Sequence, residues 1–490
     1  MLNSIVNHSV IQNTNRLDAE FFQPKFLKLQ KKLRKGKYKK LGEVCVFINT
    51  GPAGSNLLAS LYTKNGIKVL RPSNLDGWNC GDGNSVFISE ENCKKNNLQI
   101  YENEDLLIAR VGDVKFGIIE TVANGRYTIS PNLFALRPKR DLINPYFLLA
   151  FLNTKFGLPQ IQRGKKLASL ASIGIEQIAN ILIPALPLKK QIKIGKVVKR
   201  GLKKIQSAKT LYSKAENILL KRIGFDKIET LFKDCHSERP KGVEESHTTN
   251  FHSTSVVLDP STRLRLGRDD NRSSIEINIT KVREKRRADA EYFLAQKYNI
   301  GKSIKSIQIG EIAQIFRGIE PGRKAYQKSG KLFLRVSNIG KYGLLEKSQK
   351  YISNDLYEKL RGKYQPRIGE VLLIKDGKPG VALTISKPIE GIISEGIVRL
   401  KLDTSLTAEY ISLCVNSLIC RSQINADIDG SLVPHWKIEQ MKKLRIPIIP
   451  PKERKILTDN IKKSTKFFQE SKNNLRQAVK QVENLINNIL

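Results

Sequence analysis

Three side chains close together in the sequence have the types that a nuclease centre uses. Glu370, Lys375 and Asp376 fall in the phrase EVLLIKDG at 370–377, at the two ends of a β-type run. Carboxylates grouped with a lysine can activate water for attack on a phosphodiester. The same trio is also common in an ordinary solvated turn, and the turn is the preferred interpretation here.

A second candidate for chemistry is NPYF at 144–147, which resembles the Asn/Asp-Pro-Pro-aromatic motif of amino-methyltransferases. The second proline is missing, and Asn144 with Pro145 already makes a good helix start, with Asn as cap and Pro at the first position. The sequence contains no GxxxxGK[ST] phosphate loop and no glycine-rich strand–turn–helix signature for a methyl donor. We therefore expect a binding protein rather than an enzyme.

Cysteine and histidine give little evidence of a metal or disulfide. The six cysteines form no CxxC pair, which favours reduced thiols in a cytoplasmic protein. Three of the five histidines (His236, His247 and His252) lie near Cys235, but their spacing fits no standard zinc pattern. The N-terminus lacks the features of a signal peptide, and no apolar run is long enough for a membrane span. No metal or cofactor is expected.

Charge is the strongest feature of the composition. The 490 residues contain 85 Lys and Arg against 46 Asp and Glu, a net charge of +39. A positive field of this size suits a polyanion, because neutralising phosphates releases condensed counterions. The charge and length together favour nucleic acid as the partner over a basic ribosome-like or membrane-surface protein.

The chain repeats itself. RLDAEFFQPKF at 16–26 returns as RADAEYFLAQKY at 287–298, about 271 positions later. Five further matches follow in the same order, and they include LRPSN at 70–74 with LRVSN at 334–338, and IEQI with IEQM at 175 and 438. Six ordered matches indicate a duplicated domain of about 150 residues.

Each copy ends in a proline-punctuated extended stretch and then a long helix. Apolar residues of both helices alternate steps of three and four, the 3.5-residue period of a coiled-coil seam. The alternative is an amphipathic helix lying on its own domain. Because both seams have equal length and equivalent positions, we expect the helices to pair antiparallel through Ile194, Val198, Ile205, Tyr212, Leu219, Leu457, Ile461, Phe468, Leu475, Val482 and Leu485.

The predicted fold is α+β. Short β-type runs with Gly and Asn turns precede a helix in each copy, at NPYFLLAFLNT and at TAEYISLCVNS. The expected parts are a first domain at 1–187, a first long helix at 188–232, a linker at 233–285, a second domain at 286–449 and a second long helix at 450–490.

Residues 235–274 interrupt this plan. They are polar, carry no periodicity and have no counterpart in the other copy. The phrase DPSTRLRLGRDD resembles translated palindromic elements that insert in frame into bacterial genes. We expect a disordered insertion, placed where a linker tolerates extra length.

The doubled DAE-aromatic-Phe phrase and the runs IEQI…IPALPLKKQ (175–191) and IEQM…IPIIPPKERK (438–454) resemble the DNA-specificity subunit of type I restriction–modification systems. The similarity covers nearly the whole chain outside 235–285. One departure is Lys190-Gln191 and Glu453-Arg454, where the family has Glu-Gln. The resemblance implies two target-recognition domains that each read half of a split DNA site.

The same resemblance implies partners and chemistry outside this chain. The paired helices would space the two domains and dock two methyltransferase subunits, and motor-nuclease subunits would join them. S-adenosylmethionine, ATP and Mg²⁺ are expected only in those subunits. Because the two domains differ in most residues, the DNA site should be bipartite and asymmetric.

Polar loop residues that flank the strands are the candidates for DNA contact, since Arg and Lys pair with guanine edges and Asn with adenine, while other cations take phosphates. Arg71 and Arg335 are the strongest, because each stands beside the same Ser-Asn. For any single residue a solvated surface role is the alternative. In the first domain the candidates are Arg71, Ser73, Asn74, Arg110, Lys115, Arg126, Asn132, Arg163, Lys165 and Lys166, and in the second Arg317, Arg323, Lys324, Arg335, Ser337, Asn338, Lys375, Lys378, His435 and Lys437.

Other functions remain open on sequence alone. The chain would serve equally as the specificity subunit of a fused restriction–methylation enzyme without a separate motor. A coiled-coil scaffold or RNA-binding protein would not select a gapped duplex motif, and an enzyme in its own right would methylate DNA alone.

Overall fold

The structure is a computed structural model of the 490-residue chain, and it forms two compact units. Unit 1 comprises Met1–Gln206 with Glu470–Leu490, and unit 2 comprises Ser207–Gln469. Each is described by itself. The residues that the structure describes are 11, 16, 18–52, 56–63, 65–81, 85–120, 125–165, 172–224, 263–267, 274–278, 305–346, 348–428 and 434–489.

The main sheet of unit 1 has four antiparallel strands. Its order is β2 (Cys45–Thr50), β9 (Leu133–Pro138), β6 (Leu106–Ala109) and β7 (Phe116–Ile118). The inner strands are apolar on both faces, and β6 and β7 are buried at every position. Such continuous apolar runs are typical of strands covered on both sides.

A second sheet of unit 1 is mixed. Its order is β3 (Tyr62–Thr63), β5 (Val86–Ile88), β4 (Ile67–Leu70) and β8 (Tyr127–Ile129), with β4 parallel to β8. In addition, β1 (Tyr38–Lys40) pairs with β10 (Leu182–Pro184). The 3₁₀ turns of unit 1 are η1 (Leu41–Val44), η3 (Ala59–Leu61) and η4 (Pro72–Asn74).

Helices cover these sheets. The most buried is α4 (Pro145–Leu152), which has no exposed residue. Asn144 caps it by accepting a hydrogen bond from the Phe147 amide at 3.0 Å, and Pro145 occupies the first turn, so the predicted helix start is confirmed. The other short helices are α2 (Pro24–Lys35), α3 (Glu90–Lys95), α5 (Leu158–Gly164) and α6 (Ile175–Ala179).

Unit 2 repeats the four-stranded sheet. The order is β14 (Ala313–Arg317), β22 (Ile397–Leu402), β19 (Val371–Ile374) and β20 (Ala382–Thr384), again all antiparallel. This is the order β2-β9-β6-β7 of unit 1 in equivalent elements. The predicted duplication is thus present in the topology as well as in the sequence.

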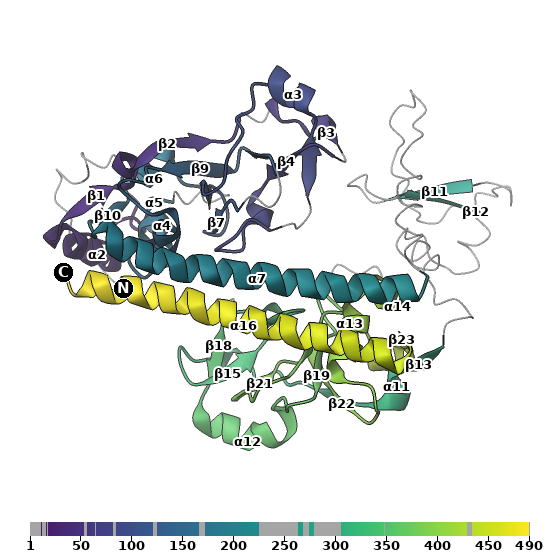
Figure 1. The fold of residues 1–490 in the computed structure, drawn as a ribbon. Helices are drawn as coiled ribbons and strands as arrows, with labels where there is room; N and C mark the ends of the chain where they lie inside the picture. Colours follow the sequence, from purple (N-terminus) through teal and green to yellow (C-terminus); the bar gives the residue numbers. More distant parts are fainter. Residues whose placement is uncertain are drawn as a thin grey trace, which may run out of the picture. The chain divides into compact units, whose positions relative to one another are not determined.

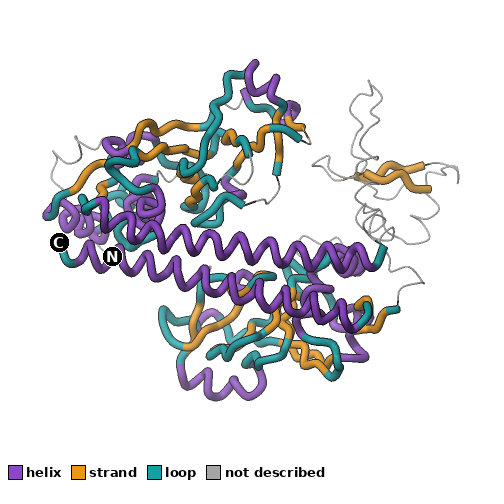
Figure 2. Tube along the Cα trace, viewed as in Figure 1, coloured by secondary structure: helices purple, strands orange, loops and turns teal. Residues whose placement is uncertain are grey.

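The other elements of unit 2 follow the same plan. β18 (Lys350–Ile352), β15 (Lys331–Leu334) and β21 (Gly391–Ile393) form a sheet in which β15 and β21 are parallel, as β4 and β8 are in unit 1. The remaining elements are β13 (Ser306–Gln308), β16 (Ile339–Gly340), β17 (Gly343–Leu344), β23 (Arg445–Pro447), η5 (Arg323–Ala325), η6 (Val336–Asn338), α11 (Ile309–Ile312), α12 (Asn354–Tyr364), α13 (Ala408–Asn416), α14 (Leu418–Asp427) and α15 (Ile438–Lys443). Figure 2 shows these short strands and the loops that join them.

The two long helices are α7 (Leu188–Arg222) and α16 (Pro451–Asn487), seen in Figure 1. They begin where the proline-punctuated stretches predict. The first was predicted to run to residue 232, but it ends at Arg222, and Gly224 follows with φ +76°. Glycine adopts this left-handed conformation without steric cost and commonly ends helices.

Each unit contains parts of both long helices. In unit 1, Ile194, Val198 and Leu202 of α7 share one apolar cluster with Leu475 and Val482 of α16. In unit 2, Tyr212 and Leu219 of α7 share another with Leu457 and Ile461 of α16. Arg222 forms an ion pair with Glu453 at 3.3 Å in unit 2, and Lys204 with Glu470 at 2.6 Å in unit 1.

The predicted seam residues are buried with two exceptions. Ile205 and Leu485 are only half-buried, and the neighbouring Leu202 and Ile486 are fully buried instead. An α-helix has 3.6 residues per turn, so a strict 3.5-residue pattern drifts by about 20° per heptad. The buried stripe therefore departs from the strict pattern by one position at Leu485 and Ile486, and near the middle of α7 it runs through Leu202 instead of Ile205.

The predicted insertion is partly structured. β11 (Arg263–Gly267) lies inside the range 235–274 and pairs antiparallel with β12 (Ser274–Asn278). For residues 263–267 the expectation of disorder is therefore wrong. Their alternation of Arg and Leu, with Leu264 opposite Ile277 and Leu266 opposite Ile275, is the period-two pattern of a strand. The rest of the predicted insertion, apart from Ser274, lies outside the described residues.

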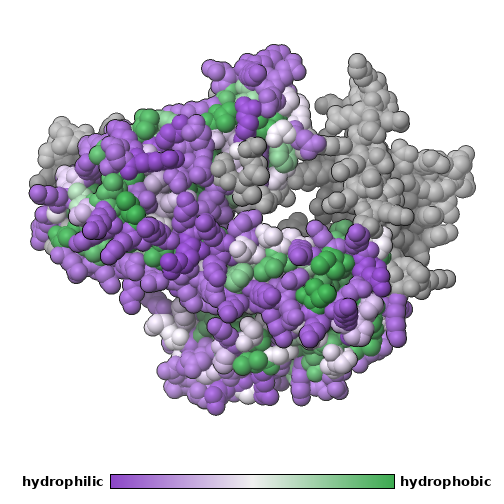
Figure 3. Space-filling model, viewed as in Figure 1, coloured by the Kyte–Doolittle hydropathy of each residue, from purple (hydrophilic) through white to green (hydrophobic). Residues whose placement is uncertain are grey.

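No helix in the described part of the chain has both the length and the apolar composition needed to cross a membrane. Hydrophilic residues cover much of the visible face of each unit, and hydrophobic residues appear there in smaller groups (Figure 3).

Candidate DNA-recognition surfaces

The doubled Ser-Asn phrase forms the same turn in both units. Each turn follows a central strand, β4 or β15. In unit 1 the Asn74 side-chain oxygen accepts from the Arg71 amide at 2.8 Å, and the Asn74 amide donates to the Arg71 carbonyl at 2.8 Å. In unit 2 the corresponding distances between Asn338 and Arg335 are 3.0 and 2.8 Å.

The asparagines of these turns are structural. Asn74 and Asn338 are 2% and 1% exposed, and their side-chain NH₂ groups donate to the carbonyls of Gly81 and Leu345. An amide engaged in this way is not presented to an adenine edge, so the expected readout by these two side chains is wrong. Sequence reasoning missed the burial because both roles favour Asn before a loop.

The other residues of the two turns are more accessible. Ser73 and Ser337 are exposed, and Arg71 and Arg335 are half-buried. The Arg335 guanidinium donates to the Ser348 carbonyl. The structure thus gives the doubled arginines the same position in the two units, as the doubled phrase predicts, and their contact with DNA stays a prediction.

A second pair of loops shares a main-chain arrangement. The β6–β7 loop (110–115) and the β19–β20 loop (375–381) join the third and fourth strands of the main sheets. The Arg110 amide donates to the Asn132 carbonyl and the Lys375 amide to the Gly396 carbonyl, both at 2.9 Å. Gly112 and Gly377, at φ +69° and +75°, turn these loops at points where a Cβ would meet open space.

A later segment of each domain lies against these loops. In unit 1 the Ile173 amide donates to the Arg110 carbonyl at 3.1 Å, and Val111 forms a β-bridge with Ser172. In unit 2 the Trp436 amide donates to the Lys375 carbonyl at 2.9 Å. There, Asp376 bridges His435 in the same antiparallel sense.

The side chains in unit 2 form a cluster around a carboxylate. Asp376 accepts from Lys375 Nζ at 2.6 Å and contacts His435 Nδ1 at 2.8 Å. The structure therefore brings together Lys375 and His435, which the sequence predicted separately. Lys378 and Lys437 are exposed close by in the chain.

The possible nuclease trio is not assembled around Asp376. Glu370 is buried and accepts two hydrogen bonds from buried Arg399, both at 2.8 Å. It also accepts from the Arg367 amide at 2.8 Å. This carboxylate joins the start of β19 to β22, so the expected solvated turn is wrong for Glu370, which is a buried structural group.

Metal ligands do not gather within the described ranges. No group of three His, Cys, Asp or Glu side chains there is arranged to hold a metal ion. Cys45, Cys80, Cys93, Cys414 and Cys420 are free thiols, and burial raises the pKa of Cys45 and Cys414 to about 12. Cys235 and the three histidines near it lie outside the described residues.

The equivalent loop of unit 1 has other chemistry. Arg110 and Asn132 are exposed, and Lys115 is half-buried. Lys165 Nζ donates to the Gly112 carbonyl, and burial lowers the pKa of Lys165, opposed by the nearby charge of Asp113. Arg110, Asn132 and Lys165 thus come together around one loop. Lys166 lies outside the described residues.

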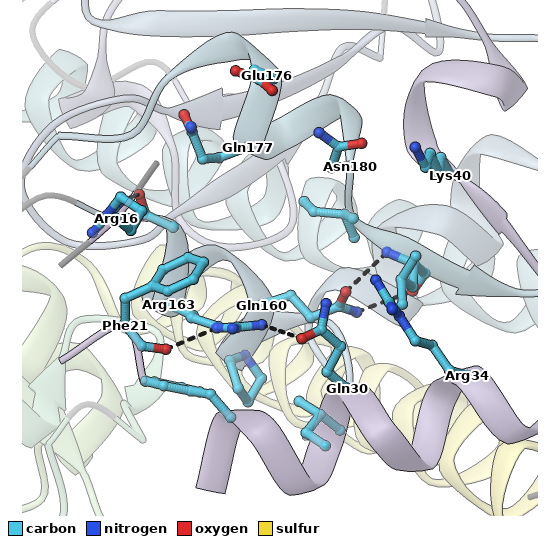
Figure 4. Close-up of a pocket in the computed structure, with 16 residues that line it drawn as sticks. Arg16, Phe21, Gln30, Arg34, Lys40, Gln160, Arg163, Glu176, Gln177 and Asn180 are labelled. Carbon is cyan, nitrogen blue, oxygen red and sulfur yellow. Dashed lines mark hydrogen bonds between the residues drawn. The ribbon is translucent and has the colours of Figure 1, made fainter. Parts of the chain in front are cut away.

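Arg163 is not presented to DNA, contrary to the prediction. It donates to the Phe21 carbonyl at 2.9 Å and to the Gln30 side chain at 2.7 Å, and its guanidinium lies 4.0 Å from the Phe21 ring centroid (Figure 4). Burial, with the charges of Arg34 and Arg16, lowers the Arg163 pKa to about 10. These contacts attach the segment before α2 to α5 beside a cavity of about 380 Å³.

The repeated phrase at 16–26 takes part in the same attachment. Arg16 forms an ion pair with Asp18 at 2.5 Å and donates to the Gly164 carbonyl at 3.1 Å. Its guanidinium lies 4.7 Å from the Phe21 ring centroid, so that ring contacts two arginines. The second copy of the phrase, 287–298, lies outside the described residues.

The remaining candidates are exposed. Arg126 forms an ion pair with Glu90 at 2.6 Å. Arg317 ends β14, and Arg323 and Lys324 lie in η5. These positions suit phosphate contacts, which remain predictions.

Comparison with known families agrees with this arrangement. Residues 34–217 match the family model described as "Type I restriction modification DNA specificity domain". Residues 34–217 are therefore a DNA-specificity domain of the type I restriction–modification family. The matched range contains both sheets of unit 1, the β6–β7 loop and most of α7.

Solved structures of specificity subunits are similar over most of the chain at low identity. The S subunit of a type I system from M. genitalium has 10% identity and a TM-score of 0.39, covering 92% of this chain and 94% of that one. The HsdS subunit from Thermoanaerobacter tengcongensis has 14% identity and a TM-score of 0.29, covering 93% and 97%. No curated protein matches the sequence.

Asp376, which contacts both Lys375 and His435, was not predicted from the sequence to take part in DNA contact. Asp376 was considered only as part of a nuclease trio. A signal was present in the alignment of the two copies, because the IEQ phrases at 175 and 438 place Ser172 opposite His435. Because Ser172 forms a β-bridge with Val111, its counterpart His435 is expected beside Asp376, the counterpart of Val111.

Proposed function

We propose that this chain reads a bipartite, gapped DNA site, with one half read by each domain. The observation that carries the proposal is the duplication of a DNA-specificity fold, with four-stranded sheets in the orders β2-β9-β6-β7 and β14-β22-β19-β20. A duplicated chain approximates the two-fold relation of a dimeric DNA-binding protein within one molecule. Because the side chains of the two copies differ, the two half-sites differ.

The long helices set the length of the gap in this proposal. Helix α7 has 35 residues and α16 has 37, and at about 1.5 Å per residue each is roughly 50 Å long. We infer that they pair as one antiparallel coiled coil. In unit 2 Ala208 contacts Ser464, and Arg222 contacts Glu453. Residue numbers therefore increase along α7 where they decrease along α16, as in an antiparallel pair.

The chemistry of restriction and modification belongs to partners in this proposal. The chain would dock two methyltransferase subunits and the motor-nuclease subunits in the cytoplasm, and S-adenosylmethionine, ATP and Mg²⁺ would bind there. Supporting this, the two acidic groups that suggested a nuclease have other roles, since Glu370 pairs with Arg399 and Asp376 with Lys375 and His435.

A selection experiment tests the proposal. The full chain is mixed with a pool of duplexes in which about 20 positions are randomised, and the bound fraction is sequenced after several rounds. The expected result is two short fixed sequences separated by a constant unspecified gap. One continuous motif, or no motif, contradicts a bipartite reader.

Salt dependence gives an independent measurement. With a net charge of +39, the chain should contact many phosphates, and the logarithm of its affinity should fall with the logarithm of salt concentration at a slope of several units. A nearly flat titration contradicts the proposal. The purified chain should show no methyl transfer or ATP hydrolysis without its partners.

A further inference from the structure

The β6–β7 loop and the β19–β20 loop begin with the same main-chain contacts and carry different side chains there, although the loops (110–115 and 375–381) differ in length by one residue. Position 110 corresponds to 375, 111 to 376 and 172 to 435, because the same hydrogen bonds and the same β-bridge occur at each pair. A fixed main chain that carries different side chains is what two related domains need in order to read different bases.

In unit 2 the side chains at these positions support one another. Asp376 uses Oδ2 for Lys375 and Oδ1 for His435, so both of its oxygens are engaged. The Asp376 side chain is 21% exposed and that of His435 is 64% exposed. Trp436, which follows His435, is 1% exposed and anchors this end of the segment in the core. The carboxylate therefore orients two nitrogen-bearing side chains at a fixed, accessible place.

In unit 1 the equivalent positions carry no such cluster. Val111 stands where unit 2 has Asp376, and Ser172 stands where it has His435. Of the three positions, only 110 carries a charged side chain, Arg110, which is exposed. Lys165 reaches the same loop and donates to the Gly112 carbonyl. At the three positions the loops thus present an oriented Lys–His pair in one domain and an arginine with Val111 and Ser172 in the other.

The Ser-Asn turns cannot explain a difference in base preference between the two half-sites. Arg71 and Arg335 hold equivalent positions, and Asn74 and Asn338 make equivalent buried hydrogen bonds. The same Arg, Ser and Asn side chains in equivalent turns would give the two half-sites the same preference. The difference between half-sites has to come from positions where the copies differ.

We propose that positions 375, 376 and 435 determine one base preference of the second half-site, and that positions 110, 111 and 172 do so for the first. In the second domain, Lys375 and His435 address the major-groove edge of a G·C pair, where guanine O6 and N7 accept hydrogen bonds. Asp376 is a positioning residue that acts through them. This inference rests on the proposed reading of two half-sites.

The test is the same duplex selection, carried out with Asp376→Asn in the full chain. The substitution keeps the side-chain size but removes the charge that holds Lys375 and His435. Preference for one G·C pair should fall by roughly 5- to 150-fold, the range of one good base contact, in a single half-site. The other half-site should stay unchanged.

A matched control separates this effect from a change in net charge. Asp355→Asn removes the same charge from the exposed first turn of α12. Both variants should bind non-specific duplex alike at each salt concentration, and only Asp376→Asn should lose base preference. A purely structural role for Asp376 would instead lower the melting temperature or weaken all binding uniformly.

The reciprocal variant tests the other domain. Val111→Asp combined with Ser172→His should alter preference only in the half-site that Asp376→Asn leaves intact. An unchanged motif in Asp376→Asn, or equal changes in both half-sites, overturns the inference while leaving the bipartite function in place. A wild-type chain that selects no gapped motif overturns the proposed function and the inference with it.

Discussion

The Ser464 hydroxyl donates a hydrogen bond to the Ala208 carbonyl at 2.7 Å, although the two residues are 256 positions apart in the chain. Ser464 and Ala208 are fully buried. A serine side chain reaches a backbone carbonyl of another helix only where the two helices lie close together, so α7 and α16 approach closely at this point in unit 2. The bond also joins the two copies of the duplication.

Substitutions at Ser464 should reveal this close approach. Ser464→Ala loses one hydrogen bond and should lower the free energy of unfolding by about 1 kcal/mol. Ser464→Leu overfills the contact and should cost about 1–3 kcal/mol. Denaturant unfolding measures both. Ser213→Ala, on the exposed side of α7, is the control and should have almost no effect, and a tolerated leucine at 464 would show that the helices do not pack here.

The buried Glu370–Arg399 pair should be sensitive to loss of one partner. Glu370→Gln leaves the Arg399 guanidinium, whose side chain is 5% exposed, without a counter-charge. Breaking such a pair costs about 3–5 kcal/mol. Glu358→Gln, in the exposed pair with Arg361 on α12, should cost less than about 1 kcal/mol. Chemical denaturation should give a much larger loss of unfolding free energy for Glu370→Gln than for Glu358→Gln. Similar losses for the two variants would contradict the structural role of Glu370.

Arg163 should matter for stability and not for base preference. Arg163→Ala removes its hydrogen bonds to Phe21 and Gln30 and should destabilise unit 1 by about 1–3 kcal/mol, the cost of lost bonds to a charged group. The motif selected from random duplex should stay the same. Arg126→Ala, which removes an exposed charge, is the control for general phosphate attraction. A changed motif with unchanged stability would restore Arg163 as a DNA contact.

Much of this fold follows from local sequence signals. The Asn144–Pro145 helix start and the seam of α16 were predictable because caps and periodicity depend on neighbouring residues. Asn74 and Arg163 were misjudged, since their burial depends on contacts with distant segments. The Asp376–His435 contact joins residues 59 positions apart, and no local pattern predicts it. The alignment of the two copies makes Ser172 equivalent to His435, but the contact itself is seen only in the structure.

Glu120 should make the stability of unit 1 depend on pH. Burial raises the pKa of this carboxyl, while Tyr146, Lys199 and Lys203 partly oppose the shift. A pKa that is higher in the folded state than in the unfolded state means that folding favours the protonated carboxyl. The contribution of Glu120 to the free energy of unfolding is therefore fully present below about pH 4.5, and it is lost as the pH rises through the folded-state pKa. Glu120→Gln should therefore stabilise the chain at pH 7.

The difference between Glu120→Gln and wild type should narrow as the pH falls toward 4, because the wild-type carboxyl becomes neutral as well. Thermal melting between pH 4 and 8 measures it. Glu91→Gln, on the exposed surface of α3, controls for the loss of one negative charge. A difference that is constant across this range would mean that burial of Glu120 does not penalise its charge.

Lengthening both long helices tests whether they set the gap between half-sites. The two insertions are placed at the same height along the helix pair, where Ala208 and Ser464 are in contact. One lies between Ala208 and Lys209 in α7, and the other lies between Lys463 and Ser464 in α16. Seven residues return the buried stripe close to the same face and add about 10 Å. At about 3.4 Å per base pair that is roughly three pairs of extra gap.

The rotation of DNA distinguishes one heptad from three. Three extra base pairs turn the second half-site by about 100° around the duplex, at about 10.5 pairs per turn, whereas one heptad turns the helix by only about 20°. One heptad in each helix should therefore weaken binding. Three heptads add about 31 Å, close to one full turn of DNA, and should restore affinity with a gap about nine pairs longer. Duplex selection measures both variants, and an unchanged gap would show that the helices do not determine the spacing.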